Sequence, residues 1–157
     1  EINPKLFFYS FDFSHKALEI LITKSRAQKL EEKISVFHWD PVATVLPTPY
    51  PYDEHASIIP QPEECDLGLV VFVLSAISPQ KMVSVMQRTS VYIKSGGIIL
   101  VRDYAEGDMA QKRFNKKRQN SELGENFYVR GDGTRAFYFT QEFVEQLCSD
   151  CKVFASV

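Results

Sequence analysis

A run of nearly unbroken apolar residues constrains the fold of this chain most strongly. Residues 67–74, LGLVVFVL, follow Asp66 and contain no charged side chain. Such a short run is typical of a parallel β-strand that is covered on both faces, because neither face then needs polar side chains. We therefore expect this strand at the centre of a sheet, and IILV at residues 98–101 predicts a second buried strand.

Predicted helices alternate with these strands. Ser14, Ser78 and Thr140 each precede apolar residues at helical spacing, and serine and threonine are preferred N-caps. The helix after Ser78 is expected to extend through Ile93 and to end at residues 95–97, SGG. Further predicted elements are strands at 5–11, 34–39 and 153–157 and a basic helix at 106–120. Strands joined by crossover helices predict an α/β fold with a Rossmann-like, doubly wound and mostly parallel sheet.

A proline-rich segment interrupts this alternation. Six of the eight prolines lie within residues 41–64, at positions 41, 47, 49, 51, 60 and 62. Proline cannot donate a backbone hydrogen bond, so this density predicts a long surface loop without a regular helix or a central strand.

Residues 123–140, LGENFYVRGDGTRAFYFT, predict an antiparallel hairpin that is added late to the sheet. Gly131, Asp132 and Gly133 lie between two aromatic runs and are expected to supply the positive φ angles of a tight turn. Arg130 and Arg135 flank the turn, so the hairpin could bind phosphates through charge and bases through aromatic stacking. A packed edge hairpin with solvated arginines is the alternative, and composition alone favours it.

Charge and cysteine content exclude several classes of function. A net charge of −2 excludes a uniformly basic nucleic-acid binder, although residues 109–119 contain five basic side chains and no acid and could face an anion. Three cysteines argue against a disulfide framework and for a reducing compartment, and the CxxC spacing of Cys148 and Cys151 lacks the two further ligands that zinc needs. The chain has neither an apolar run of about 18 residues nor a basic leader, so no membrane span and no signal peptide are expected.

Acidic residues follow two of the predicted strands. Asp12 comes after the first and Asp40 after the second. A carboxylate at such a strand end can accept hydrogen bonds from both hydroxyls of a ribose, and Asp40 could accept from the exocyclic amine of adenine. Each aspartate could instead be a turn or helix-capping residue. Together they favour an adenosine-containing cofactor, but the residues contain no G-x-G-x-x-G turn; either the chain begins after the first strand of the sheet or it binds no nucleotide.

Longer stretches carry a family resemblance. They read CDLGLVVFVLSAISPQKM, GGIILVRDYAEGDMAQKRF and LGENFYVRGDGTRAFYFTQEFVEQL. Together with DFSHKALEIL from Asp12, they resemble the eukaryotic tRNA 3-methylcytidine methyltransferases of the methyltransferase-like family. The resemblance implies a class I methyltransferase that uses S-adenosyl-L-methionine to modify a cytidine of the tRNA anticodon loop, without a metal.

The same resemblance implies that the glycine-rich cofactor turn precedes Glu1 and that closing strands follow Val157. We therefore expect residues 1–157 to form one partial domain that is trimmed at both ends. In such a fragment, the apolar edges of residues 67–74 would be exposed and solubility would be low.

Candidate site residues follow from the resemblance. Those expected to bind the cofactor are Asp12, Phe13, Asp40, Pro41 and Val71, although relatives have a leucine at the position of Pro41. Those expected to be catalytic are Arg102, Asp103 and Tyr104, at the carboxyl end of the strand at 98–101. A substrate-facing insert and hairpin at 102–140 is expected to bind the substrate through Lys112, Arg113, Lys116, Asn126, Tyr128, Arg130 and Arg135.

Two further interpretations stay open. The chain could be a noncatalytic, truncated paralogue that serves as an RNA- or protein-interaction module, because it lacks the glycine-rich turn. It could also be a nicotinamide-dependent oxidoreductase with Asp12 at a ribose, although RDY and ENFYVRGDGTRAFYF have no role in such an enzyme. The methyltransferase interpretation implies tRNA as a partner, with an aminoacyl-tRNA synthetase or another protein as a candidate second partner. It also implies the cytoplasm as the location, with the nucleus as an additional one.

Overall fold

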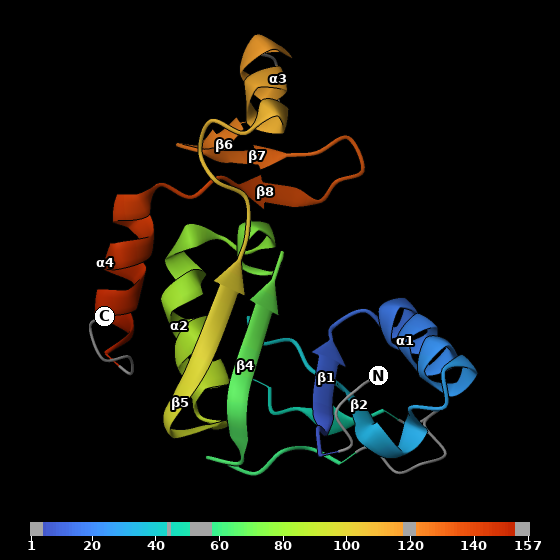
Figure 1. The fold of residues 1–157 in the computed structure, drawn as a ribbon. Helices are drawn as coiled ribbons and strands as arrows, with labels where there is room; N and C mark the ends of the chain where they lie inside the picture. The colour runs from blue at the N-terminus through green and yellow to red at the C-terminus, as the bar shows by residue number, and fades with distance from the viewer. Residues whose placement is uncertain (1–4, 44, 51–57, 118–121, 153–157) are drawn as a thin grey trace. The chain divides into compact units, whose positions relative to one another are not determined.

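A computed structural model of the chain describes residues 5–43, 45–50, 58–117 and 122–152, with the side chains of residues 115–117 excepted (Figure 1). Contacts divide the chain into two compact units, Glu1–Gln61 and Pro62–Val157. The predicted strand at 153–157 lies outside the described residues. One partial domain over 1–157, with a surface loop at 41–64 and an insert at 102–140, stays a prediction.

The first unit contains a small sheet and one long helix. Its elements are β1 (Phe8–Asp12), α1 (His15–Ala27), the 3-10 helix η1 (Glu31–Lys33), β2 (Ile34–His38) and β3 (Thr48–Pro49). β1 and β2 are parallel, with Asp12 opposite His38, and β3 pairs antiparallel with β2. Ser14 caps α1 as predicted, because its Oγ accepts a hydrogen bond from the Ala17 N–H at 3.3 Å.

The proline-rich segment contributes a residue to the core of this unit. Leu18 and Ile22 of α1 pack with Val36 of β2 and with Tyr50. Tyr50 is only 2% exposed, which the proline pattern of residues 41–64 does not predict. Pro49 lies in the edge strand β3, where a missing N–H is tolerated. Residues 44 and 51–57 of this segment lie outside the described residues.

The second unit contains a parallel strand pair, two helices that pack on each other and a small antiparallel sheet. Its elements are β4 (Cys65–Val71), the 3-10 helix η2 (Leu74–Ala76), α2 (Pro79–Ser90), β5 (Ile93–Arg102), α3 (Met109–Lys117), β6 (Glu122–Gly124), β7 (Phe127–Val129), β8 (Arg135–Phe137) and α4 (Gln141–Cys151). β4 and β5 are parallel. α2 buries Met82, Val85 and Met86 and packs against α4, whose N-cap is Thr140 as predicted.

The prediction that the helix after Ser78 extends through Ile93 is wrong. α2 ends at Ser90, and residues 93–97 already belong to β5. Hydrogen bonds from the Cys65 N–H to the Tyr92 carbonyl and along the β4–β5 pair stabilise the extended conformation there. Gly96 and Gly97 therefore do not end a helix. Gly96 adopts φ +80°, and a Cβ on Gly97 would lie 2.7 Å from Ile93 Cγ2, so both glycines serve an irregular start of the strand.

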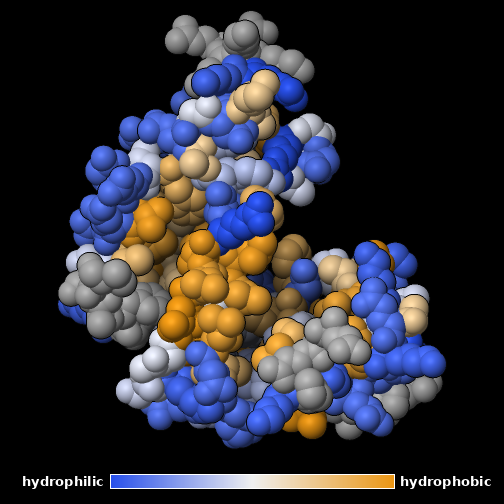
Figure 2. Space-filling model, viewed as in Figure 1, coloured by the Kyte–Doolittle hydropathy of each residue, from blue (hydrophilic) through white to orange (hydrophobic). Residues whose placement is uncertain are grey.

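The prediction that residues 67–74 form a strand covered on both faces is also wrong for the described structure. Val70 is buried, whereas Leu67, Leu69 and Val71 on the opposite face are exposed. Their exposed partners on β5 include Ile98 and Leu100, and Figure 2 shows the resulting apolar surface over β4 and β5. Since α2 lies along one face of the pair, the other face has no cover among the described residues of this unit. In the described residues β4 pairs with β5 alone, so its other edge has no strand partner there. Low solubility stays a prediction.

The predicted hairpin is confirmed, but its turn differs from the expectation. β7 and β8 pair antiparallel, and the Arg130 N–H donates to the Thr134 carbonyl at 2.7 Å. Only Gly133 has a positive φ, of +81°; Gly131 and Asp132 do not. The loop is closed instead by the Asp132 carboxylate, which accepts from the Thr134 hydroxyl and N–H. These hydrogen bonds lower the pKa of Asp132, so this acid is a turn residue.

Candidate functional site

The carboxyl ends of β4 and β5 carry the residues of the candidate site in the second unit. β5 ends at Arg102, and Asp103 and Tyr104 follow. The Phe72 N–H donates to the Arg102 carbonyl at 2.9 Å and extends the strand pair by one residue. Ligands of open α/β sheets bind at this end of the strands.

The antiparallel sheet β6–β7–β8 is attached directly to this strand end. The Phe139 N–H donates to the Tyr104 carbonyl, and the Glu106 N–H donates to the Phe139 carbonyl, each at 2.9 Å. In Figure 1 the sheet lies beyond the arrowheads of β4 and β5. The hairpin and the residues after β5 therefore form one continuous structure.

Asp103 is held by backbone donors on both carboxylate oxygens. Oδ2 accepts from the Ser75 N–H of η2, and Oδ1 accepts from the Tyr104 N–H, each at 3.0 Å. The half-buried carboxylate thus ties η2 to the end of β5. Each oxygen keeps a second lone pair, so these bonds leave room for a donor from a ligand.

Two aromatic rings contact Tyr104, and guanidinium groups lie over the rings of Tyr104 and Phe72. The Tyr104 ring lies 4.9 Å from the Phe72 ring and 5.8 Å from the Tyr138 ring, between centroids. The guanidinium carbon of Arg130 lies 5.0 Å from the centroid of Tyr104, and that of Arg102 lies 5.7 Å from the centroid of Phe72. Both distances are within cation–π range. The structure thus brings together Arg102, Tyr104 and Arg130, which the sequence interpretation assigned to two separate motifs.

Buried tyrosines support this arrangement from the hairpin. Tyr138 is fully buried, and its hydroxyl has no hydrogen-bond partner among the described residues. Burial raises the pKa of Tyr138, against an opposing effect of the Arg130 charge. Tyr128 is buried as well, and its ring stacks on Phe114 of α3 at 5.2 Å. In the described structure Tyr128 therefore packs within the unit, and its substrate contact stays a prediction.

A polar network joins α3 to the hairpin through Asn126. Asn126 Oδ1 accepts from Gln111 Nε2 at 2.7 Å, and Asn126 Nδ2 donates to Glu106 Oε1 at 3.4 Å. Gln111 is 4% exposed and also accepts from the Gly107 N–H. Asn126 adopts φ +57°, a conformation that asparagine tolerates better than most residues. Asn126 thus fixes the loop before β7, and its predicted contact with a substrate is untested.

Most of the predicted basic residues that are described have exposed side chains, whereas Arg130 is half-buried. Lys112 and Arg113 on α3 and Arg135 on β8 are exposed and form no ion pair with another described residue. The side chain of Lys116 lies outside the described part of the chain, as do those of residues 117 and 118. The exposed cations can therefore reach an anionic ligand, and their substrate role stays a prediction.

The cofactor candidates of the first unit lie at the carboxyl ends of β1 and β2. Asp12 Oδ1 accepts from the Ser14 N–H at 2.8 Å, and Asp40 Oδ1 accepts from the Val42 N–H at 2.9 Å. These are the turn roles that the sequence left open. The second carboxylate oxygen of each aspartate forms no hydrogen bond with the described residues, so each can still accept from a ribose or an adenine. Phe13 is exposed and Pro41 is buried, while Val71 is an exposed residue of the second unit.

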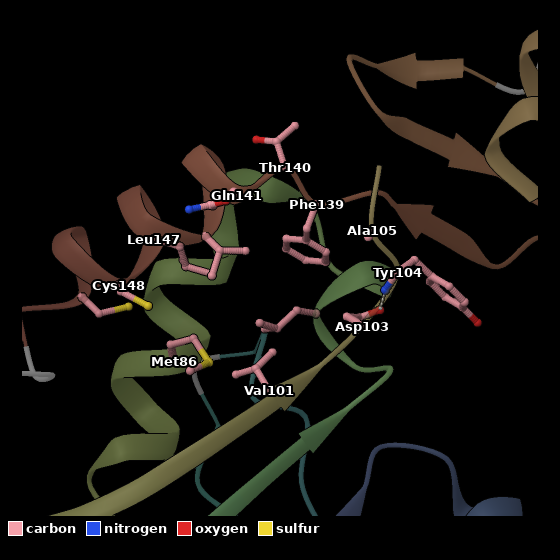
Figure 3. A pocket seen from close by; sticks show the side chains of 13 residues that line it. Met86, Val101, Asp103, Tyr104, Ala105, Phe139, Thr140, Gln141, Leu147 and Cys148 are labelled. Atoms are coloured by element: carbon pink, nitrogen blue, oxygen red, sulfur yellow. Dashed lines mark hydrogen bonds between the residues drawn. The ribbon is translucent and has the colours of Figure 1, made fainter. Parts of the chain in front are cut away.

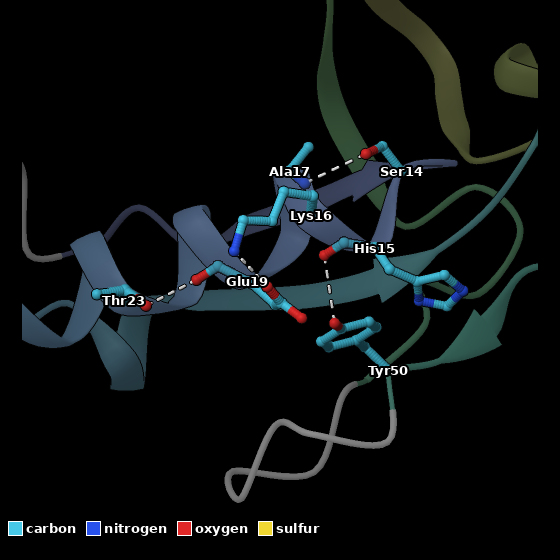
Figure 4. A network of polar contacts seen from close by, with 7 residues as sticks. All are labelled: Ser14, His15, Lys16, Ala17, Glu19, Thr23 and Tyr50. Atoms are coloured by element: carbon cyan, nitrogen blue, oxygen red, sulfur yellow. Dashed lines mark hydrogen bonds and ion pairs between the residues drawn. The ribbon is translucent and has the colours of Figure 1, made fainter.

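Two histidines meet next to Asp12, which the sequence interpretation missed. The rings of His15 and His38 stack at 4.7 Å with an angle of 7° between their planes. His38 Nε2 lies 3.0 Å from the Phe13 carbonyl. The Tyr50 hydroxyl donates to the His15 carbonyl at 3.3 Å (Figure 4). No sequence pattern indicates this stack, because it joins the first residue of α1 to the last residue of β2, which are far apart in the sequence. No cluster of three or more His, Cys, Asp or Glu residues in the described part of the chain could hold a metal.

An apolar groove of about 370 Å³ lies beside β5 in the second unit (Figure 3). Its lining includes Met86 of α2 and Leu147 and Cys148 of α4, with Asp103 at the end of β5. The ring of Tyr104 points away from it. Burial raises the pKa of Cys151, another lining residue, to about 11, so that cysteine is a thiol at neutral pH. The lining of the groove is mainly apolar, and Asp103, Thr140 and Gln141 are among its few polar residues. The residues around Tyr104 combine exposed aromatic and cationic groups and are therefore the better candidate site.

Comparisons with known proteins fit this architecture. No family model matches the chain. The tRNA N(3)-cytidine methyltransferase METTL2 of Xenopus tropicalis is 42% identical over 146 residues, which are 92% of this chain and 39% of that protein. The tRNA N(3)-cytidine methyltransferase METTL6 of Homo sapiens is 39% identical over 150 residues, which are 96% of this chain and 48% of that protein. The chain thus spans less than half the length of these relatives.

A solved structure supports the fold independently of the sequence. The crystal structure of a SAM-dependent methyltransferase from Methanosarcina mazei matches with a TM-score of 0.68 at 13% identity, over 91% of this chain and 67% of that one. The predicted α/β, Rossmann-like fold class and the family resemblance are both confirmed. No helix among the described residues is both long and apolar enough to cross a membrane. The chain is thus related in sequence to a part of the tRNA N(3)-cytidine methyltransferases and has the fold of a SAM-dependent methyltransferase.

Proposed function

We propose that this chain is part of an S-adenosyl-L-methionine-dependent methyltransferase that forms 3-methylcytidine in the anticodon loop of tRNA. The observation that carries the proposal is the 42% identity to a tRNA N(3)-cytidine methyltransferase across 92% of the chain. The chain corresponds to 39% of that relative, so the activity is proposed for the whole protein of which these residues form a part.

The acidic strand ends of the first unit fit an adenosine-containing cofactor. The free oxygen of Asp12 is a suitable acceptor for a ribose hydroxyl, and that of Asp40 for the adenine amine. Phe13 and Pro41 of the first unit would supply apolar contacts to the adenine, and a cofactor contact of Val71 in the second unit stays a prediction. When bound, S-adenosyl-L-methionine supplies an electrophilic methyl group.

The acceptor nitrogen does not need a strong general base. N3 of cytosine carries a lone pair in the plane of the ring, so it can attack a methyl carbon without first losing a proton. The protein must then hold the base in line and stabilise the positive charge of the product ring. Asp103 places a carboxylate at the end of β5, where it can provide that negative field or accept from the exocyclic amine. Tyr104 would orient the base.

The target base must leave its stack before it can react, which a loop permits more easily than a duplex. Arg130, Arg135, Lys112, Arg113 and Lys116 would bind the RNA backbone, and Asn126 and Tyr128 would support the surface that carries them. We propose tRNA as the principal partner and an aminoacyl-tRNA synthetase or another protein as a candidate second partner. The proposed location is the cytoplasm, with the nucleus as an additional one.

Calorimetric titration with S-adenosylhomocysteine tests the cofactor part of this proposal. Two proteins are compared: this chain, and a chimera extended at its amino end with the corresponding residues of the Xenopus relative. We expect the chimera to bind and to transfer methyl groups to tRNA. Binding by neither protein, together with retained RNA binding, would favour the noncatalytic interaction module.

Arg130→Ala is expected to weaken tRNA binding in a salt-dependent way. Loss of one phosphate contact lowers the slope of log K against log salt concentration by about 0.7–1. The measurement is fluorescence anisotropy with labelled tRNA at several salt concentrations. Lys94→Ala removes the same charge at the opposite end of β5, where Lys94 pairs with Asp66 at 2.7 Å, and should leave the slope unchanged. If Arg130→Ala and the parent protein had the same slope, the proposed contact of Arg130 with a phosphate would be contradicted.

A further inference from the structure

Phe72 has a backbone conformation that its side chain does not explain. It follows β4 directly and adopts φ +55°, in the left-handed region that favours glycine and that bulky side chains rarely occupy. The residue is nevertheless 46% exposed, so burial offers limited compensation for this strain. The hydrogen bond from its N–H to the Arg102 carbonyl stabilises the backbone and would be equally available to a glycine. A strained, exposed aromatic residue at a strand end is typical of a functional site.

The surroundings of Phe72 form a surface suited to a planar, anionic ligand. Its ring contacts Tyr104 at 4.9 Å between centroids, with an angle of 36° between the planes. The guanidinium groups of Arg102 and Arg130 lie at the two ends of this ring pair. Exposed aromatic faces stack on nucleic-acid bases, and guanidinium groups bind phosphates or stack on bases in turn.

The interaction energies favour stacking of a nucleic-acid base on the Phe72 ring over the cation–π contact with Arg102. Arg102 is exposed and lies near the outer limit of cation–π range, where the attraction is weak. Stacking of an aromatic side chain on a base is the stronger interaction of the two. An arriving base can therefore displace Arg102 from the ring, and the released guanidinium can bind an adjacent phosphate.

We propose that Phe72 is a substrate-binding residue whose exposed ring stacks on the cytosine that has left the RNA stack, while Arg102 binds a neighbouring phosphate. The proposal rests on the proposed function and adds a residue to its substrate site. The sequence interpretation assigned Val71 but gave Phe72 no role.

Phe72→Gly separates this role from a structural one. Glycine removes the ring and suits φ +55°, so the melting temperature should stay equal or rise. We expect the dissociation constant for an anticodon stem-loop RNA to increase about 5- to 150-fold, equivalent to ~1–3 kcal/mol of lost stacking. Phe72→Trp keeps an aromatic face and should restore binding. Glu63→Gly is the matched control, because Glu63 has φ +57° and is exposed in the same unit. Its melting temperature should likewise stay equal or rise, and the dissociation constant for the RNA should not change.

An abasic RNA identifies the stacked base. The parent protein should bind a stem-loop with an abasic target position as weakly as Phe72→Gly binds the intact RNA. Phe72→Gly should not distinguish the two RNAs. Equal affinity of the parent protein and Phe72→Gly for the intact RNA would overturn the proposal. A drop in melting temperature without rescue by Phe72→Trp would also overturn it, in favour of a structural role.

The experiments distinguish a failure of the proposed role of Phe72 from a failure of the proposed methyltransferase activity. Absence of methyl transfer by the parent chimera would contradict the proposed activity, whereas the binding comparison still decides the role of Phe72. Normal methyl transfer by the parent, with unchanged kcat/KM in the Phe72→Gly chimera, would overturn the role of Phe72 and leave the activity in place.

Discussion

Asp103→Ala is expected to abolish methyl transfer and to lower the free energy of unfolding of the second unit by about 1–3 kcal/mol. The substitution leaves the Ser75 and Tyr104 N–H groups without their acceptor, and Ser75 is buried. Without this carboxylate, η2 and the residues after β5 lose their direct connection, so the Tyr104 ring loses its fixed position. The activity effect is measured in the extended protein with tRNA, and the stability effect by urea denaturation of this chain.

Two variants calibrate this experiment. Asp103→Asn keeps one acceptor oxygen but places an amide N–H₂ against a second backbone donor, so it should restore stability only in part. Asp66→Ala removes an exposed carboxylate of the same unit and should change neither stability nor turnover. Normal turnover by Asp103→Ala would contradict the proposed role. Cofactor affinity should be largely retained in all three variants.

Met82→Ala is expected to be strongly destabilising, with a loss of about 2–5 kcal/mol in the free energy of unfolding. Met82 is fully buried in α2, beside Val85 and Met86. Since the opposite face of the β4–β5 pair is exposed, the core of this unit depends on the face that α2 covers. A loss of this size is a large fraction of the total stability of an ordinary domain.

Urea denaturation followed by circular dichroism measures the effect of Met82→Ala. Lys81→Ala, at the preceding exposed position of the same helix, should leave the denaturation midpoint unchanged. If both variants unfolded at the same urea concentration, α2 would not contribute the core that the structure assigns to it.

Local signals in the sequence predicted most of the helix and strand positions. The Ser14 and Thr140 caps are formed by side-chain hydrogen bonds to residues three positions later, so the residues that decide them are close in sequence. The hairpin is similar, because Gly133 and the Asp132 carboxylate close the turn within a few residues. Met82 and Leu18 are fully buried, and both belong to the apolar residues at helical spacing that follow Ser78 and Ser14.

Apolar composition gave a wrong prediction where the outcome depended on which other elements pack against a segment. The run at 67–74 is compatible with burial on both faces, but composition does not reveal which elements cover a strand, and Leu67 and Leu69 are exposed. The sequence Gly96-Gly97 is compatible with a helix end and with an irregular strand. Only the pairing of β5 with β4 shows that the two glycines belong to a strand. Part of the candidate site was predicted, because Arg102, Asp103 and Tyr104 follow a recognisable strand.

The sequence alone therefore determined the local elements, the α/β class and the family resemblance, because these depend on residues that are near one another in the chain. The tertiary structure decided which side chains meet. It places Arg130 over Tyr104 and Tyr104 beside Phe72, ties Asp103 to η2 and buries Tyr50 in the core of the first unit. These contacts join segments that are distant in sequence, and they depend on strand register and on the hydrogen bonds that attach the hairpin to the end of β5. No local pattern encodes such a register, because it results from the packing of the whole unit.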